Sequence, residues 1–160
     1  MTAPAIWKAL SLLQPYAGLV VCDPTVAPRK IVENRGRVIF RPPRGGVWLA
    51  LHASLGRWPG DDTFGERMDA VFPGWRGVPD VRGSLLGVFH VSGIRTYETI
   101  LGKTAAERAE RDLGPQAFGS VCYMIDDARP LAMPIPCKGA MGLWTVPAEH
   151  APALTALVTS

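Results

Sequence analysis

The run from Val47 to His52 reads Val-Trp-Leu-Ala-Leu-His, an apolar stretch with one polar residue at its end. A continuous apolar run of this length is typical of a strand that is buried on both faces of a sheet. Other short apolar runs, separated by Gly and Pro, fill much of the chain, and two or three stretches have helical spacing. The sequence therefore predicts an α+β fold, a small β-barrel, closed or partly open, with peripheral helices.

The expected elements follow from these patterns and from the turn residues between them. We expect strands over 6–13, 38–40, 47–52, 84–94, 120–126, 129–136 and 141–146, and helices over 14–21, 61–72, 99–113 and 149–158. No linker, internal repeat or low-complexity run interrupts the 160 residues. The chain is therefore predicted to be a single domain over 1–160, with its motifs between about 9 and 146.

Charge is distributed unevenly along the chain. The formal net charge is only +3, but the segment 28–58 contains Arg29, Lys30, Arg35, Arg37, Arg41, Arg44 and Arg57 against Glu33 alone. The following segment, 59–80, is mostly acidic, with Asp61, Asp62, Glu66, Asp69 and Asp80. A surface that binds a polyanion produces such an asymmetry, and so does an ordinary solvated face.

The cysteines and the chain's first residues indicate the compartment. Cys22, Cys122 and Cys137 lie far apart, with no spacing typical of a zinc site or a disulfide framework. No secretory signal pattern or membrane-length apolar run is present. We expect a cytoplasmic protein with reduced thiols, no membrane association, no metal and no cofactor.

The stretch Arg29-Lys30-Ile31-Val32-Glu33-Asn34-Arg35 places ionisable groups and an amide around one apolar pair. In an extended chain, Glu33 and Arg35 would share one face, and Lys30 and Asn34 the other. Neither face would be cleanly apolar, which is typical of a strand that supplies polar groups to a cleft. A soluble edge strand explains the same pattern.

Four motifs occur in a fixed order along the chain. They are Ser11-Leu12-Leu13-Gln14-Pro15-Tyr16-Ala17, then Lys30 to Arg35, then Trp48-Leu49-Ala50-Leu51-His52-Ala53-Ser54, then Lys138-Gly139-Ala140-Met141-Gly142-Leu143-Trp144. Their order and residue types resemble the ASCH domain family, whose fold is related to the PUA domains of RNA-modifying proteins. The resemblance extends from about Ala9 to Trp144, and it implies a PUA-like barrel and a function on RNA. Tyr16 stands where the family more often has tryptophan.

The resemblance also raises a catalytic alternative. Some small ASCH enzymes are amidohydrolases that remove an acetyl group from acetylated cytidine, using a lysine and a threonine three positions later. Lys30 matches that lysine, but Glu33 stands in the place of the threonine. Lys30 and Glu33 could still form an acid–base pair for hydrolysis of a nucleoside amide or of RNA, or a structural ion pair.

The remaining candidates are polar or aromatic groups at the motif ends, suited to stacking on a base, reading its edge or binding a phosphate. The predicted nucleic-acid-binding residues are Gln14, Pro15, Tyr16, Lys30, Asn34, Arg35, His52, Ser54 and Lys138. Each has a structural alternative, such as core packing for Tyr16 or a satisfied hydrogen bond for His52.

These observations favour a domain that binds RNA, another nucleic acid or a modified nucleoside in one basic cleft. The alternatives are a hydrolase acting in that cleft and a small-molecule or protein-interaction domain that uses the cleft without catalysis. The sequence leaves open RNA versus DNA, the base recognised and the oligomeric state.

Overall fold

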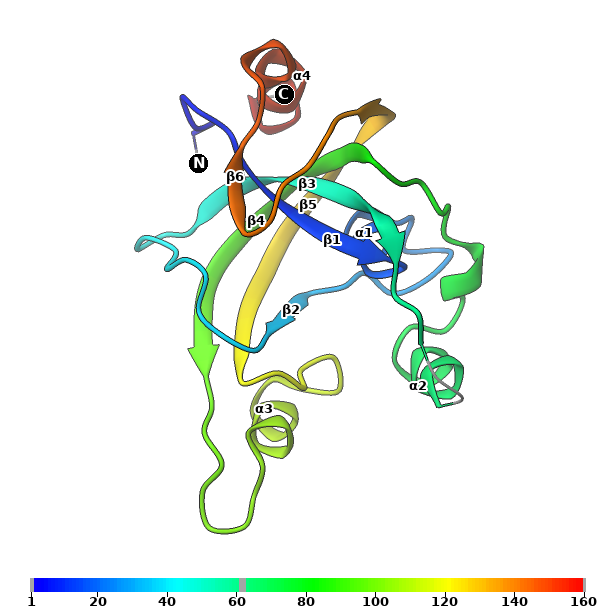
Figure 1. Ribbon diagram of the computed structural model, residues 1–160, viewed down its shortest axis with the longest axis vertical. Helices are drawn as coiled ribbons and strands as arrows, with labels where there is room; N and C mark the ends of the chain where they lie inside the picture. The colour runs from blue at the N-terminus through cyan, green and yellow to red at the C-terminus, as the bar shows by residue number, and fades with distance from the viewer. Residues whose placement is uncertain (1, 61–62, 160) are drawn as a thin grey trace.

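The computed structural model describes residues 2–60 and 63–159, and helices surround one mixed β-sheet in it (Figure 1). The strands are β1 (Lys8–Gln14), β2 (Val32–Arg35), β3 (Val47–Arg57), β4 (Ser84–Thr96), β5 (Val121–Pro136) and β6 (Leu143–Thr145). The α-helices are α1 (Tyr16–Val21), α2 (Phe64–Val71), α3 (Ala105–Leu113) and α4 (Ala151–Thr159), and short 3₁₀ helices span Trp75–Gly77 and Ala148–His150. The predicted α+β class is confirmed.

The six strands are ordered β2-β5-β4-β3-β1-β6. β1 and β3 are parallel, whereas the other neighbouring pairs are antiparallel. Within the described residues, the edge strands β2 and β6 do not pair with each other, so the sheet is not closed into a barrel. The closed form of the prediction is therefore wrong, and a partly open β fold is compatible with the structure.

The sheet is buried on both faces, as the apolar run of β3 predicts. Leu49 and Leu51 pack on one face with residues of β1, β4, β5 and α1. Trp48 and Ala50 point to the other face and share a second core with Trp7, Trp144 and Leu154, the last of which lies on α4. Since successive side chains of a strand point to opposite faces, one uninterrupted apolar run supplies both cores.

β5 differs from the prediction of two strands around Asp127-Ala128. It is continuous from Val121 to Pro136, and its pairing with β4 contains register shifts. One shift leaves Asp126 as an extra residue opposite His90 and Val91, and the Asp126 carboxylate contacts His90 Nδ1 at 2.6 Å. The polar break in the sequence is therefore a β-bulge, which re-aims a side chain without ending the strand. The predicted strand at 38–40 is also wrong, because these residues lie outside the strands.

The helices pack against one another and against the sheet. α2 begins at Phe64, whereas Asp61 and Asp62, where the sequence predicts its first turn, lie outside the described residues. Phe64 and Met68 of α2 pack with Leu19 of α1. α3 begins after Thr104, whose hydroxyl accepts a hydrogen bond from the Glu107 amide, and its Ala109 packs against Val32 of β2. No helix in the described part of the chain is long and apolar enough to cross a membrane.

Candidate functional site

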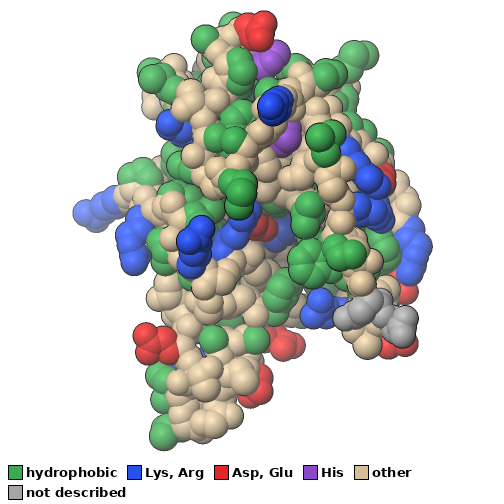
Figure 2. Space-filling view, viewed as in Figure 1, with side chains coloured by type: hydrophobic (Ala, Val, Ile, Leu, Met, Phe, Trp, Pro, Cys, Tyr) green, Lys and Arg blue, Asp and Glu red, His purple; other side chains and the backbone are tan. Residues whose placement is uncertain are grey.

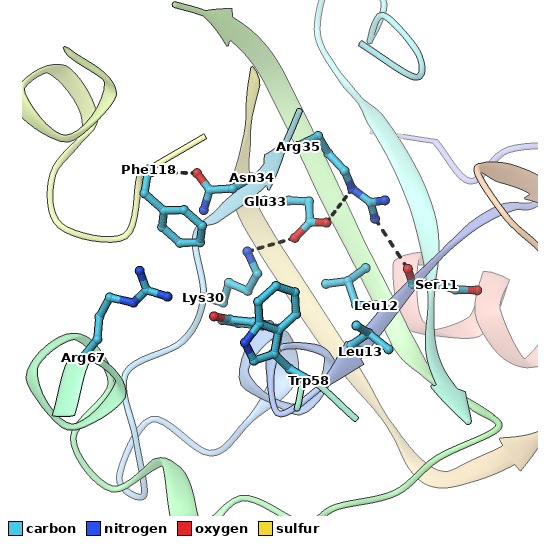
Figure 3. Close-up of a pocket in the computed structure, with 11 residues that line it drawn as sticks. Ser11, Leu12, Leu13, Lys30, Glu33, Asn34, Arg35, Trp58, Arg67 and Phe118 are labelled. Atoms are coloured by element: carbon cyan, nitrogen blue, oxygen red, sulfur yellow. Dashed lines mark hydrogen bonds and ion pairs between the residues drawn. The ribbon is translucent and has the colours of Figure 1, made fainter. Parts of the chain in front are cut away.

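A cavity of about 260 Å³ opens between β1, the start of α1, the segment 30–35, α2 and the loop that precedes β5 (Figure 3). We call it the Lys30 cleft. Its lining residues are Ser11, Leu12, Leu13, Tyr16, Lys30, Glu33, Asn34, Arg35, Trp58, Arg67 and Phe118. The structure therefore brings together five of the residues predicted from sequence, namely Tyr16, Lys30, Glu33, Asn34 and Arg35.

The polar centre of the cleft is a carboxylate between two cations. Lys30 Nζ lies 3.0 Å from Glu33 Oε1, and Arg35 Nε lies 2.8 Å from Glu33 Oε2. The Lys30 and Glu33 side chains are only 4% and 9% exposed, whereas Arg35 is 27% exposed. Lys30 Nζ also donates to the Val32 carbonyl. Because buried charges are costly unless they are paired and hydrogen-bonded, the three side chains depend on one another.

Lys30 and Glu33 meet because the chain is not extended throughout this stretch. β2 begins only at Val32, and the Lys30 main-chain N–H donates to the Leu19 carbonyl at the end of α1, at 2.8 Å. Strict alternation from Arg29 would have placed Lys30 and Glu33 on opposite faces. The irregular segment before β2 instead turns the ammonium group towards the carboxylate.

Aromatic rings and a further cation border the polar centre. The Tyr16 and Trp58 rings are 6.2 Å apart in an edge-on arrangement, and Lys30 Nζ lies 5.7 Å from the Tyr16 ring centre. Phe118 lies across the cleft, with the Arg67 guanidinium 5.3 Å from its ring centre (Figure 3). Trp58 and Phe118 are 42% and 43% exposed, so part of each ring is open to a ligand.

Burial changes the acidity of the phenol in the cleft. Desolvation raises the pKa of Tyr16 above its usual value of 10.0, and the nearby Glu33 carboxylate adds to the increase. The Arg67 guanidinium opposes it, both by its charge and by a hydrogen bond. The Tyr16 hydroxyl therefore keeps its proton at neutral pH and can donate as well as accept a hydrogen bond.

Gln14 and Asn34, two of the predicted binding residues, position the cleft through hydrogen bonds within the protein. The buried Gln14 side chain donates to the Val81 carbonyl at 2.7 Å and accepts from the Gly18 amide at 2.9 Å, which orients α1. Pro15 is the N-cap residue, immediately before α1. Asn34 Oδ1 accepts from the amides of Phe118 and Gly119, both at 2.9 Å. Its amide group thus holds the loop that presents the Phe118 ring.

The other three predicted residues, His52, Ser54 and Lys138, lie around a second hollow of about 560 Å³. We call it the His52 hollow. It is lined by Ser11, His52, Ser54, Leu55, Gly83, Cys137, Lys138, Gly139, Ala140 and Met141. Ser11 is common to both sites, since its side chain faces His52 and its carbonyl lies 3.4 Å from Arg35 Nη2.

The polar groups of the His52 hollow are bonded to one another. His52 Nδ1 and Ser11 Oγ are 2.9 Å apart, and His52 Nε2 lies 2.7 Å from the Cys137 carbonyl. That nitrogen must carry a proton, because a carbonyl can only accept. Trp144 Nε1 also donates to Ser11 Oγ at 3.0 Å. A side chain at Gly139 would put its Cβ 2.4 Å from His52 Cε1, so the space that this glycine leaves is filled by the imidazole ring.

Six lining residues of the Lys30 cleft are absent from the site predicted by sequence. Ser11, Leu12 and Leu13 belong to the first sequence motif, whereas Trp58, Arg67 and Phe118 belong to none. Trp58 directly follows β3, Arg67 belongs to the acidic stretch around α2, and Phe118 lies in an irregular loop. No motif or spacing connects these three residues in the sequence. The only local signal is Trp58 itself, a large aromatic residue next to Pro59 and Gly60, two residue types that favour exposed turns.

Among residues 2–60 and 63–159, no group of three or more His, Cys, Asp or Glu side chains is placed to hold a metal ion. The three cysteines are free thiols. Burial raises the pKa of the Cys22, Cys122 and Cys137 thiols. A scan against protein-family models found no match to this chain, and a search of curated proteins found no matching relative.

Proposed function

We propose that this chain is an ASCH-type, PUA-like domain that binds single-stranded RNA or a modified nucleoside, with one unpaired base in the Lys30 cleft. The observation behind the proposal is the composition of that cleft. Rings with exposed faces, Trp58 and Phe118, border a buried carboxylate that is paired with Lys30 and Arg35. Aromatic faces stack on unpaired bases, and charged hydrogen-bonding groups recognise the edge of a base.

The charge around the cleft suits a nucleic-acid backbone. Arg67 lies at the cleft, and Arg37, Arg41 and Arg44 lie on the loop between β2 and β3. Figure 2 shows Lys and Arg side chains projecting from this loop on the left, and Asp and Glu side chains gathered around α3 below. Cations of this kind attract phosphates from a distance and release counterions when they bind them. We therefore expect the backbone of the RNA strand to contact Arg67 at the cleft and the arginines of the loop between β2 and β3.

A hydrolase acting in the same cleft is the second candidate, because Lys30 Nζ contacts Glu33 Oε1 at 3.0 Å beside the cavity. In this alternative Glu33 accepts a proton from water as the water attacks an amide or phosphate ester, and Lys30 donates a proton to the leaving group. The same contact also serves as a structural ion pair. Product analysis separates the two roles.

Fluorescence anisotropy with a labelled single-stranded RNA octamer of mixed sequence, at several salt concentrations, tests the binding proposal. Arg67→Gln should weaken binding similarly for all sequences and reduce the salt slope by about one. Arg111→Gln, an exposed arginine of the same type on α3, is the matched control and should leave both unchanged. Equal affinity for a duplex of the same sequence, or no binding, would contradict the proposal.

Mass spectrometry of RNA and of acylated or otherwise modified nucleosides incubated with the protein tests the hydrolase candidate. If it is correct, product forms with the wild type and is lost in both Lys30→Met and Glu33→Gln. Binding without product would assign the cleft to recognition alone. Because both variants alter a buried ion pair, their folded state is checked first by circular dichroism.

A further inference from the structure

We infer that the Lys30 cleft selects a uracil-type base, one whose edge presents an acceptor, a donor and an acceptor in that order. This inference rests on the proposed binding of an unpaired base, and it adds the identity of that base. It depends on the arrangement of Lys30, Glu33 and Arg35, which alternate in charge along the inner wall of the cleft (Figure 3).

The three side chains form a row of hydrogen-bonding groups in the order donor, acceptor, donor. Glu33 is central, with Lys30 at its Oε1 atom and Arg35 at its Oε2 atom. An ammonium group has three N–H bonds, and that of Lys30 contacts the Val32 carbonyl and Glu33. A guanidinium group has five, and that of Arg35 contacts Glu33 and the Ser11 carbonyl. Each group therefore retains N–H capacity for a ligand.

The carboxylate also retains capacity. A carboxylate accepts about four hydrogen bonds through its two oxygen atoms. Lys30 and Arg35 each take one position, on opposite oxygens. Glu33 can therefore accept one further N–H placed centrally, between its two cationic neighbours. The ligand edge that satisfies the whole row has one central donor with an acceptor on each side.

The imide edge of uracil has this pattern, because the O2 and O4 carbonyls flank the N3–H donor. Thymine has the same edge, with its methyl group outside it. Cytosine would place the N3 lone pair against the Glu33 carboxylate if its O2 faced a cation. Guanine has two adjacent donors, N1–H and the N2 amino group, so the second donor would face Lys30 or Arg35. The row of charges thus favours uracil-type bases and disfavours cytosine and guanine.

The size and walls of the cleft agree with a single pyrimidine. The cavity of about 260 Å³ is smaller than most small-molecule sites, which measure ~300–1,000 Å³. Trp58 and Phe118 offer ring faces on its borders, and Leu12 and Leu13 line the remaining apolar side. The Arg67 guanidinium lies 5.3 Å from the Phe118 ring centre, on the side of the cleft that Phe118 borders. Its charge can bind a phosphate attached to the bound nucleoside.

The test uses a seven-residue RNA strand in which abasic residues flank one central base, so that all probes share the same backbone. The central base is uracil, 5-methyluracil, 3-methyluracil, cytosine or guanine. Methylation at N3 removes the central donor and keeps both carbonyls, whereas methylation at C5 leaves the imide edge intact. We expect uracil and 5-methyluracil to bind about tenfold or more tightly than the other three.

Glu33→Gln is the matched protein variant, because an amide has the shape of the carboxylate but both donates and accepts. It should bring the affinities for uracil and cytosine to within about threefold of each other, since the amide group can donate to cytosine N3. Arg111→Gln should leave the discrimination unchanged. If Glu33→Gln does not fold, the comparison of 3-methyluracil with 5-methyluracil on the wild type decides the question alone.

The possible outcomes separate this inference from the proposed function. Equal affinity for all five probes, or a preference for guanine or cytosine, would overturn the uracil assignment and leave single-strand binding intact. Absence of binding to every probe and to the mixed octamer would overturn both. A preference for uracil and 5-methyluracil over 3-methyluracil that weakens in Glu33→Gln would support both.

Discussion

The Lys30 cleft and the His52 hollow are two polar sites that share Ser11, and they use their polar groups in different ways. In the hollow, both nitrogens of His52 contact protein atoms, and Gly139 lies directly against the imidazole ring. In the cleft, the charged groups contact one another beside an open cavity.

The difference shows that a buried polar cluster is not by itself a binding site. The bonds of His52 join β3 to β1 and to the segment that precedes β6, so they serve the fold. The cations and the carboxylate of the cleft keep unused hydrogen-bonding positions, so they can serve a ligand as well. The comparison predicts that changes in the hollow alter stability alone, whereas changes in the cleft alter binding, with or without stability.

Glu33→Leu should have the largest effect. It leaves the Lys30 ammonium group buried without its carboxylate, at a cost of about 3–5 kcal/mol in the free energy of unfolding. The double variant Lys30→Met/Glu33→Leu removes both buried charges and should recover most of the lost stability. Neither the single nor the double variant should bind RNA. Urea unfolding measures the stabilities. A loss below about 1 kcal/mol in the single variant would show that Lys30 is solvated or paired elsewhere.

Gly139→Ala tests the hollow. The new Cβ would lie 2.4 Å from His52 Cε1 and 2.9 Å from Ser11 Oγ, so the ring or the main chain must shift, at a cost of about 1–3 kcal/mol. Gly36→Ala is the matched control, because no heavy atom lies within 4 Å of the place its new methyl group would take and its φ is not in the left-handed region. RNA affinity should stay within about twofold of the wild type in both variants. A large loss of affinity in Gly139→Ala would show that the hollow takes part in binding.

Trp58→Ala tests the cleft without changing its charge. Loss of one stacking ring should weaken RNA binding by about 1–3 kcal/mol and leave the salt slope unchanged, since no cation is removed. Met141→Ala removes an exposed apolar side chain from the His52 hollow and serves as the control. Anisotropy titrations at two salt concentrations give both quantities. Equal effects of the two substitutions would remove the distinction between the sites.

The parts of this comparison that the sequence could predict are those with a local physical cause. The run from Val47 to His52 predicts a strand buried on both faces because consecutive apolar residues of one segment supply both cores. Lys30, Glu33 and Arg35 are recognisable because several ionisable groups in one short stretch are unusual for core packing. Tyr16 follows from the first motif, and it too lies in the cleft.

The rest depends on how distant segments meet. Trp58, Arg67 and Phe118 come from three separate segments. They meet through the packing of α2 against α1, the bonds of Asn34, and the hydrogen bond from the Trp58 main-chain N–H to the Gln14 carbonyl. The sequence also could not separate His52 from Lys30, because the order of motifs along a chain does not say which site each one faces. The bulge at Asp126 has the sequence pattern of a turn, since both interrupt an apolar run in the same way.

The smallest expected effects concern the pH dependence of stability. The Lys30 cleft and the His52 hollow each contain a weakly acidic side chain whose pKa is raised by burial. Burial raises the pKa of Tyr16 in the cleft above 10.0, and it raises the pKa of Cys137 in the hollow above 9.0, with a further contribution from Glu149. A raised pKa means that the folded state binds the proton more tightly than the unfolded chain. Each group's contribution to stability is therefore complete below its unfolded pKa and is lost as the pH rises through its folded pKa.

The two contributions should disappear in different pH ranges, because the thiol titrates from a lower starting value than the phenol. Cys137→Ser should flatten the decline of stability that begins near pH 9, and Tyr16→Phe the decline that begins near pH 10. Urea unfolding of the wild type and both variants between about pH 8 and pH 11 measures these profiles. If Tyr16→Phe left the alkaline decline unchanged, the phenol would be solvated, and the cleft would be more open to water than its geometry indicates. A flattened decline would instead establish Tyr16 as a neutral hydrogen-bonding group, available to a ligand at physiological pH.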